Sequence, residues 1–270
     1  MGDVEAIVLG VVQGLTEFLP ISSSGHLVLA SYWLGLRAEG ASLELAVDIA
    51  TNTGTFLAVL WVLRRDVARA AAGFLRGLVS PAARGDPGWR LAWLVIIGSV
   101  PTAAIGLGLR GVFEHLNAPV PASLALIVTG LILWTAPASG RRDAPQDLTW
   151  RDALVVGFAQ GLAVMPGISR SGTTIASLLW RDVEAATAAR LSFLLYLVAS
   201  AGVAVLGLTD VREAGFGWRA VALMTVASFL TGWLALTWLF RLLKRGRFRW
   251  FAPYLWLIAA ATLLRVLLSA

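Results

Sequence analysis

The sequence predicts an all-α polytopic membrane protein, an inverted-topology repeat with six spanning helices and two re-entrant helical hairpins. The apolar composition, the lengths of the apolar segments and an internal repeat lead to this fold class. Of the 270 residues, 58% are hydrophobic and 14% are charged, and the mean hydropathy is +0.77. Because a soluble domain carries about 25% charged residues, the composition argues against soluble, fibrous and disordered proteins.

Six apolar segments approach the length of roughly 20 residues that a helix needs to cross a bilayer. They are about 44–63, 90–110, 121–138, 186–208, 218–240 and 250–268. Two other apolar segments, 4–21 and 153–168, each run into a bend rich in Gly, Pro and Ser. The apolar pieces that follow, 27–36 and 173–180, are too short to cross alone. We therefore expect two hairpins that enter and leave the membrane on one side, with their bends buried in protein or facing water.

The basic residues indicate the orientation. Most of the 22 Lys and Arg lie in the segments 64–90, 139–151 and 241–249, which six spans and two hairpins place on one side as loops. The positive-inside rule makes this side cytoplasmic. The net charge of +6 is therefore a topology signal, and we expect membrane lipids rather than nucleic acid as partners.

The chain repeats itself with an offset of 147 residues. Residues 10–26 read GVVQGLTEFLPISSSGH, residues 157–173 read GFAQGLAVMPGISRSGT, and eight of the 17 aligned positions are identical. Three spans follow each copy, and an odd number of crossings inverts the second half. We therefore expect a single integral membrane domain over 1–270, with repeat one at about 1–140 and repeat two at about 150–270. Such repeats place a site near the membrane midplane, where interrupted helices meet.

The first bend carries groups suited to catalysis. Gln13 and Glu17 are four residues apart and share one helical face. The residues that follow are Ser22, Ser23, Ser24, Gly25 and His26, of which Ser24 and Gly25 are candidates for binding the substrate. Close helix packing would explain the serines and the glycine, but not Glu17 together with His26. An ionisable group at membrane depth costs at least ~2.5 kcal/mol on insertion scales, so both are functional candidates.

The second bend, MPGISRSGTT at 165–174, suits an anion. Glycine lets backbone N–H groups converge on a ligand, and Arg170 adds a forked donor that matches phosphate oxygens. The expected binding residues of this bend are Ser169, Ser171, Gly172, Thr173 and Thr174. The alternative is a structural Arg170 that pairs with Glu17, which would also bring the two bends together.

The two bends together suggest a phosphate ester or anhydride handled within the bilayer. Such chemistry needs a nucleophile, a group that activates it and positive charge for the phosphoryl oxygens. The nucleophile stays open between Ser23, Ser22 and direct attack by His26, which otherwise serves as base or acid. Glu17, with Gln13, is the candidate ligand of a hard divalent cation.

One further polar stripe lies in the first predicted span. Asp48, Asn52 and Thr55 recur at helical spacing and share one face. Asp48 and Asn52 are therefore candidates for lining the same cavity. Hydrogen bonding between helices is an equally good interpretation.

Two segments of the sequence resemble the motifs of a known family. QGLTEFLPISSSGH (13–26) and PGISRSGTT (166–174) resemble the two motifs of the undecaprenyl-diphosphate phosphatases of the bacitracin-resistance type. Segments 53–67 and 191–197 extend the similarity over essentially the whole chain. The resemblance implies a hydrolase of the bacterial inner membrane that converts undecaprenyl diphosphate to undecaprenyl phosphate and inorganic phosphate. It would thereby recycle the lipid carrier for cell-wall synthesis.

The resemblance also implies a requirement for Mg²⁺ or Ca²⁺ and a site that opens to the extracytoplasmic side. By motif position, Gln13 and Glu17 correspond to the family's acidic pair and Arg170 to its phosphate-binding arginine. Ser22, Ser23 and His26 correspond to its hydroxyls and its histidine. Gln13 is a variant that removes one metal-binding charge.

Two alternatives stay open. Inverted repeats with broken helices are typical of transporters, so a transporter or flippase of a lipid-linked phosphate is the competing hypothesis. Serine and glycine bends that only pack helices would make a purely structural membrane protein. A homodimer is also left open by the sequence.

Overall fold

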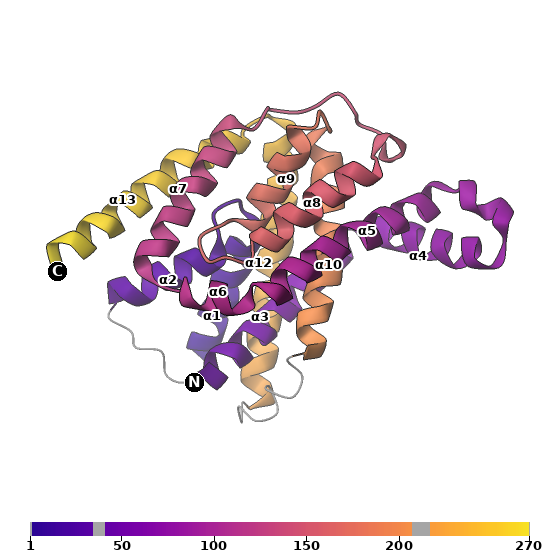
Figure 1. The fold of residues 1–270 in the computed structure, drawn as a ribbon. Helices are drawn as coiled ribbons and strands as arrows, with labels where there is room; N and C mark the ends of the chain where they lie inside the picture. The colour runs from indigo at the N-terminus through magenta and orange to yellow at the C-terminus, as the bar shows by residue number, and fades with distance from the viewer. Residues whose placement is uncertain (1, 35–40, 207–216, 270) are drawn as a thin grey trace.

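The structure is a computed structural model that describes residues 2–34, 41–206 and 217–269. Within these ranges the regular structure is helical, apart from an isolated bridge between Arg142 and Val183 (Figure 1). The α-helices are α1 (Asp3–Phe18), α2 (Ser23–Leu34), α3 (Ala41–Val62), α4 (Arg64–Val79), α5 (Pro87–Gly108), α6 (Arg110–His115), α7 (Pro119–Thr135), α8 (Trp150–Leu162), α9 (Arg170–Leu179), α10 (Ala185–Leu206), α12 (Trp218–Lys244) and α13 (Ala252–Ser269). Short 3₁₀ helices are η1 (Pro81–Gly85), η2 (Pro145–Asp147) and η3 (Phe248–Phe251).

Several helices are long and apolar enough to cross a membrane. Among the described residues these are Pro87–Gly108, Ala185–Val205, Trp218–Lys244 and Phe248–Ser269. Val47–Val62 and Pro119–Thr135 are apolar but shorter. All six coincide with predicted spans, and large apolar side chains such as Leu257 and Val205 are exposed on them. The chain is therefore an all-helical, multi-pass membrane protein.

Each of the two predicted hairpins is a helix, a bend and a second helix. The pairs are α1–α2 and α8–α9. α1 ends at Phe18, two residues before Pro20, because proline cannot continue a helix. Serine caps the second helix of each pair: Ser22 Oγ accepts from Gly25 N at 3.3 Å, and Ser169 Oγ accepts from Gly172 N at 3.2 Å. These caps satisfy N–H groups that would otherwise be orphaned at the start of a helix.

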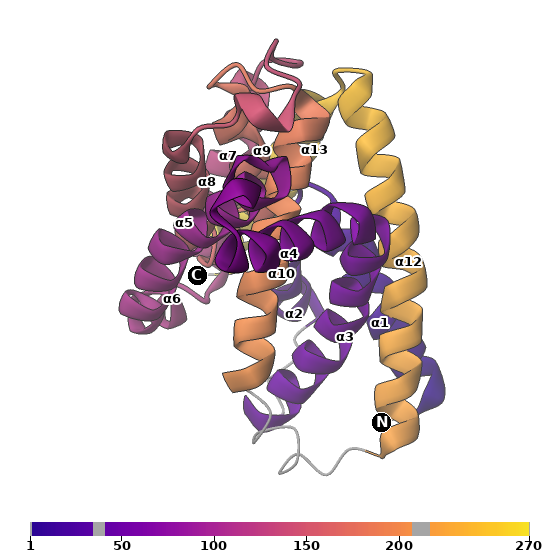
Figure 2. The ribbon, with the colours of Figure 1, turned by 90° about the vertical axis from the view of Figure 1, so that its right-hand side faces the viewer.

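The two halves of the chain interlock. α1 packs against α12 and α3, and α8 packs against α5 and α9, as Figure 2 illustrates for α1, α3 and α12. Glycines make both contacts close. A Cβ on Gly14 would lie 2.6 Å from Ser228 O of α12, and a Cβ on its repeat equivalent Gly161 would lie 2.7 Å from Ile105 Cβ of α5. Small residues thus let α1 and α8 each approach a helix from the other half of the chain.

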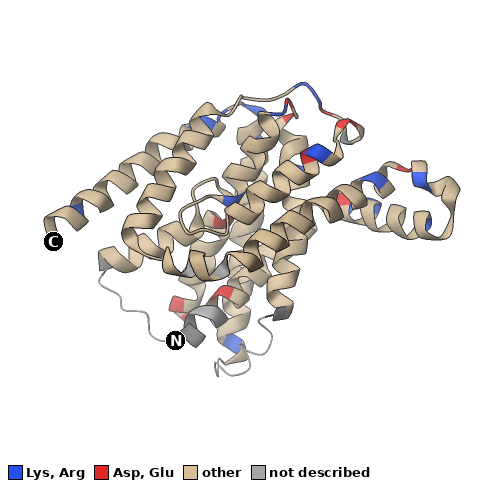
Figure 3. Ribbon diagram, in the orientation of Figure 1, with Lys and Arg blue, Asp and Glu red and all other residues tan. Residues whose placement is uncertain are grey.

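The expectation of a loop over 64–90 is wrong. This segment forms α4, which turns through η1 and returns along α5 as a hairpin that projects sideways from the helical body (Figure 1). Glycine again explains the close packing, because a Cβ on Gly73 would lie 2.7 Å from Gly88 Cα. Phe74 of α4 stacks on Trp89 of α5 with ring centroids 5.6 Å apart. The basic residues of this segment line the hairpin (Figure 3).

A buried carboxylate fixes the start of α8. Asp152 accepts hydrogen bonds from Arg142 at 3.0 and 3.1 Å, pairs with Arg181, and closes a capping box with Thr149. Burial raises the pKa of the Asp152 carboxyl, but the hydrogen bonds from Arg142 and Arg181 outweigh burial and hold this pKa well below its usual range. Asp152 therefore ties the start of α8 to the end of α9.

We expect Asp152→Asn to lower the free energy of unfolding by about 3 kcal/mol, because it leaves two guanidinium groups without their counter-charge. The folded pKa lies below the unfolded one. The stabilisation is therefore present above about pH 4 and is lost as the pH falls toward the folded value. Denaturation in detergent micelles over a pH series measures both effects.

Asp182→Asn is the matched control, since Asp182 pairs with Arg141 in a mostly exposed ion pair. Exposed pairs contribute little, so its unfolding midpoint should stay close to wild type. Equal midpoints for the two variants would contradict the anchoring role of Asp152.

Candidate functional site

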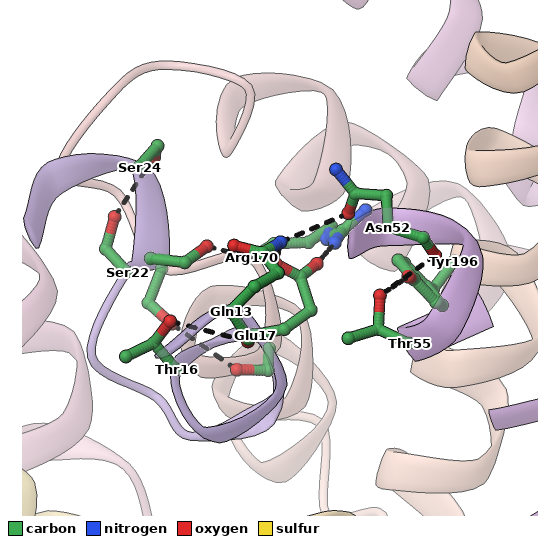
Figure 4. Close-up of polar contacts among 12 residues, drawn as sticks. Gln13, Thr16, Glu17, Ser22, Ser24, Asn52, Thr55, Arg170 and Tyr196 are labelled. Atoms are coloured by element: carbon green, nitrogen blue, oxygen red, sulfur yellow. Dashed lines mark hydrogen bonds and ion pairs between the residues drawn. The ribbon is translucent and has the colours of Figure 1, made fainter. Parts of the chain in front are cut away.

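The carboxylate of Glu17 is the centre of the candidate site (Figure 4). It lies in the last turn of α1, and its side chain is 5% exposed. Its Oε2 accepts from Gln13 Nε2 at 2.9 Å and from Ser23 Oγ at 3.0 Å. Its Oε1 forms an ion pair with Arg170 of α9. One carboxylate thus joins α1, α2 and α9.

The internal repeat explains why two different bends reach one carboxylate. Ser23 and Arg170 occupy equivalent positions, 147 residues apart, and each is the first residue of its helix. Both side chains bond to Glu17. The alternative considered from the sequence, an ion pair between Arg170 and Glu17, is the arrangement observed, and it brings the bends together.

The two bends also contact each other through backbone. A Cβ on Gly25 would lie 2.8 Å from Gly167 Cα, and Ser171 Oγ donates to Leu19 O at 3.3 Å. Gly167 has a φ of +93°, a conformation that glycine adopts without strain. Thr129 of α7 holds this turn, because its hydroxyl donates to Gly167 O at 2.8 Å and accepts from Ser169 N at 3.1 Å.

An aromatic ring positions the guanidinium. The central carbon of Arg170 lies 4.1 Å from the ring centroid of Tyr196, a cation–π contact. The Tyr196 hydroxyl lies 3.0 Å from Thr55 Oγ1 of α3. Glu17, Arg170 and Tyr196 line a cavity of about 10 Å³, which has room for about one water molecule.

The His26 ring bonds to partners outside the Glu17 network. Its Nδ1 lies 2.8 Å from Ser22 O, and its Nε2 lies 2.8 Å from the Tyr254 hydroxyl of α13. Because a carbonyl only accepts, Nδ1 carries the hydrogen and the neutral ring accepts at Nε2 from Tyr254. His26 follows Ser23 by three residues on α2, so both share a face. The Ser23 hydroxyl, however, bonds to Glu17 rather than to the imidazole.

The other predicted residues surround this network. Asn52 Oδ1 accepts from Gln13 Nε2 at 3.3 Å, so α3 joins the site, and Asp48 lies one turn earlier on α3 with its side chain exposed. The remaining predicted residues lie within the two bends, and most of their hydroxyls are close to another hydroxyl. Ser22 Oγ and Ser24 Oγ are 3.4 Å apart, as are the equivalent Ser169 Oγ and Ser171 Oγ. Thr174 Oγ1 lies 2.6 Å from Ser192 Oγ, and the Thr173 hydroxyl is buried with no hydrogen-bond partner among the described residues.

Sequence reasoning missed Tyr196, Tyr254 and Thr129. A signal was present for the tyrosines, because the chain has only three and two of them contact predicted site residues. A phenol in an apolar membrane segment needs a hydrogen-bond partner. No sequence signal distinguishes Thr129 from the other threonines of the spanning helices.

The Glu17 network contains two side chains with oxygen atoms that suit a hard divalent cation. Among the described residues, no group of three His, Asp or Glu could hold a metal. The network offers the Glu17 carboxylate and the Gln13 amide. One carboxylate with phosphate oxygens from a substrate is a typical Mg²⁺ set, so these residues fit an ion shared with a bound diphosphate.

By fold and site, the chain is a multi-pass membrane protein with a buried polar centre where the two bends of its sequence repeat meet. Residues 6–261 match the family model described as bacitracin resistance protein BacA, and the chain belongs to this bacterial family. It is 59% identical over 262 residues to the undecaprenyl-diphosphatase of Acaryochloris marina (strain MBIC 11017), covering 97% of each chain. It is 41% identical over 272 residues to that of Desulfatibacillum aliphaticivorans, covering 96% of this chain and 97% of the relative.

We expect Gly25→Ala to destabilise the protein, because the new Cβ would push the two bends apart at Gly167. The measurement is the midpoint of thermal unfolding in detergent. Gly202→Ala is the control, since a Cβ on this helical glycine meets nothing within 4 Å, and alanine favours a helix. A Gly25→Ala midpoint equal to that of Gly202→Ala would refute close contact of the bends.

Proposed function

We propose that this chain hydrolyses undecaprenyl diphosphate to undecaprenyl phosphate and inorganic phosphate. The observation that carries the proposal is the hydrogen bond from the Ser23 hydroxyl to a carboxylate that also pairs with Arg170. This unit supplies a nucleophile, a proton acceptor and an anion-binding cation. Full-length similarity to relatives named undecaprenyl-diphosphatase supports the same substrate.

Substrate binding begins with an exchange of partners at Arg170. Since the cavity beside Glu17 is about 10 Å³, a diphosphate enters only when the guanidinium turns from Glu17 to phosphate oxygens. Bidentate pairing with phosphate suits this exchange. It also frees Glu17 Oε1, while Oε2 remains bonded to Ser23.

The first chemical step forms a phosphoserine. Ser23 Oγ attacks the terminal phosphorus, its proton passes to Glu17 Oε2, and the bond from that phosphorus to the bridging oxygen breaks. Undecaprenyl phosphate leaves with the electron pair of that bond. Arg170, held over Tyr196, stabilises the negative charge on the phosphoryl oxygens.

Ser22 is less suited to attack than Ser23. It is buried, its φ is +66°, and its hydroxyl accepts from Gly25 N as part of the cap of α2. The Ser23 hydroxyl already donates to a carboxylate that can take its proton, whereas the ring nitrogens of His26 bond to Ser22 O and the Tyr254 hydroxyl. We assign the nucleophile to Ser23 on these grounds.

The second step consumes water. A water molecule attacks the phosphoserine, Ser23 recovers its proton, and inorganic phosphate leaves. We assign His26 to the activation of this water once its Nε2 has released the Tyr254 hydroxyl, because Nε2 is then an open acceptor and His26 shares a face of α2 with Ser23. Tyr254 acts as a positioning residue that fixes this tautomer.

We expect Ser23→Ala to abolish phosphate release from undecaprenyl diphosphate, a loss of at least about a thousandfold, since the covalent step loses its nucleophile. Ser24→Ala is the matched control, because Ser24 is exposed and bonds only weakly to Ser22. Acid quenching with substrate labelled at the terminal phosphate should trap label on Ser23. Full turnover by Ser23→Ala would sink this mechanism, and lipid movement across liposomes without phosphate release would favour the transporter instead.

A divalent cation, Mg²⁺ or Ca²⁺, is part of the proposal. Glu17 and the Gln13 amide oxygen would hold it with the diphosphate, and it would neutralise charge on the phosphate oxygens. Gln13 is uncharged, so the protein contributes one carboxylate.

We expect Gln13→Glu to lower the Mg²⁺ concentration for half-maximal activity by about tenfold, because it adds a second carboxylate ligand. The same variant also loses the amide donor to Glu17. Gln13→Leu is therefore the companion variant, since it loses that donor without adding charge and should raise the metal requirement. A metal dependence that is identical in wild type and both variants would place the ion elsewhere.

We also propose how the helices are arranged in the membrane. We infer six spans, two re-entrant hairpins, and halves of opposite orientation at about 1–140 and 150–270. The reciprocal packing of α1 on α12 and α8 on α5 supports this. The basic residues at the end that carries 139–150 and along the α4–α5 hairpin support a cytoplasmic assignment for that side (Figure 3). The site then faces the extracytoplasmic side, and association with a second copy stays a prediction.

A further inference from the structure

A larger cavity lies along the α4–α5 hairpin, between its η1 turn and the start of α8. Its volume is about 490 Å³, and its walls come from η1, the first half of α5, and the residues just before and at the start of α8. None of its lining residues belongs to the Glu17 network. The proposed reaction leaves this cavity without a role.

The cavity changes character along α5. Arg90, Trp93 and Ile97 recur at three and four residues, so they lie on one face of the helix. From Arg90 to Ile97 this face runs for about 10 Å. Along the helix, Arg90 places a charge at the start of this face, Trp93 an indole ring in the middle and Ile97 an aliphatic side chain at the end. The same order is found in a lipid from headgroup through interface to acyl chain.

Two arginines at the charged end have N–H donors to spare, and the Arg84 guanidinium also lies 5.8 Å from the ring centroid of Trp89. Arg84 Nε donates to Gly77 O at 3.1 Å, and Arg90 Nη2 donates to Leu148 O at 2.6 Å. Among the described residues, neither forms an ion pair. The nearby carboxylate of Asp86 is engaged by Arg76 at 2.9 Å and caps α5 through Gly88 N at 2.6 Å. Each guanidinium therefore has further donors for an external anion.

The hairpin itself has the character of an element at a membrane surface. Leu75, Leu78 and Val79 of α4 are 63%, 57% and 89% exposed, next to the basic residues of the same helix. A helix of this kind lies in the interface with its apolar side in lipid. The basic side of a membrane protein faces the leaflet that is rich in anionic lipids.

We propose that this cavity is a binding site for an anionic phospholipid of the surrounding leaflet. Arg84 and Arg90 bind the phosphate, and Trp93 and Trp150 flank the interfacial part of the lipid. Leu94 and Ile97 contact an acyl chain. The ligand chemistry is a phosphate head on an apolar chain. Polyprenyl phosphates have the same chemistry, whereas free phosphate has only the head.

The test is native mass spectrometry of the purified, full-length protein titrated with phosphatidylglycerol. We expect Arg84→Gln/Arg90→Gln to weaken the tightest binding event by about thirtyfold, since the variant removes two basic residues that would each face the phosphate head. Arg241→Gln/Arg245→Gln removes the same charge from exposed positions at the end of α12 and should bind like wild type. Equal affinity of the two double variants would overturn the proposal.

A second variant separates the lipid site from a local folding defect. Ile97→Trp fills the apolar end of the cavity without changing charge, and it should weaken phosphatidylglycerol binding while unfolding at the wild-type midpoint. Phosphatidylcholine should bind more weakly than phosphatidylglycerol in wild type. Displacement of phosphatidylglycerol by millimolar inorganic phosphate would mark a free-anion site, and tighter binding of undecaprenyl phosphate would mark a site for the carrier. Either result would overturn the assignment to a bulk lipid.

Discussion

The structure depends on one buried negative charge in a membrane. Glu17 is almost inaccessible, and an isolated carboxylate at this depth would be costly. Its cost is offset by three donors that come from three elements: Gln13 in its own helix, Ser23 in the next, and Arg170 across the repeat. The need to compensate this charge holds the two bends together, and the same contacts bring together the groups to which we assign the reaction.

The two bends of the sequence repeat share one local structure but carry different side chains. Both use a serine cap and a second serine 3.4 Å from it, and both use glycine to keep the backbone close. They differ at the first helical residue, which is Ser23 in one and Arg170 in the other. The proposed nucleophile and the proposed anion-binding cation thus occupy equivalent positions. The shared scaffold fixes the backbone, and two side chains decide the chemistry.

Much of the fold was predictable because lipid imposes simple rules. The six apolar segments appear as helices, and the proline-rich and serine-rich bends interrupt helices where expected. Helix α4 was missed because its arginines satisfy the pattern of a charged loop, while its packing on α5 depends on Gly73 and Gly77. Of the site, Gln13, Glu17, Ser23, Arg170 and Asn52 were predicted and lie in one network. The hydrogen bond between His26 and Tyr254 was not predicted, because it depends on how α13 packs beside α2.

The distance along the chain between Glu17 and its counter-charge has a consequence for biosynthesis. The two residues are separated by 153 positions, and a ribosome that adds about 5–20 residues per second needs roughly 8–30 s to cover that interval. The helix surface that later receives α1 belongs to α12 and is made later still. During this time the first hairpin has neither its ionic partner nor its packing surface. Burial of Glu17 is then uncompensated, which favours a position of the hairpin at the membrane–water interface. Maturation of this protein is then a late event, in which a waiting N-terminal segment enters a nearly finished bundle.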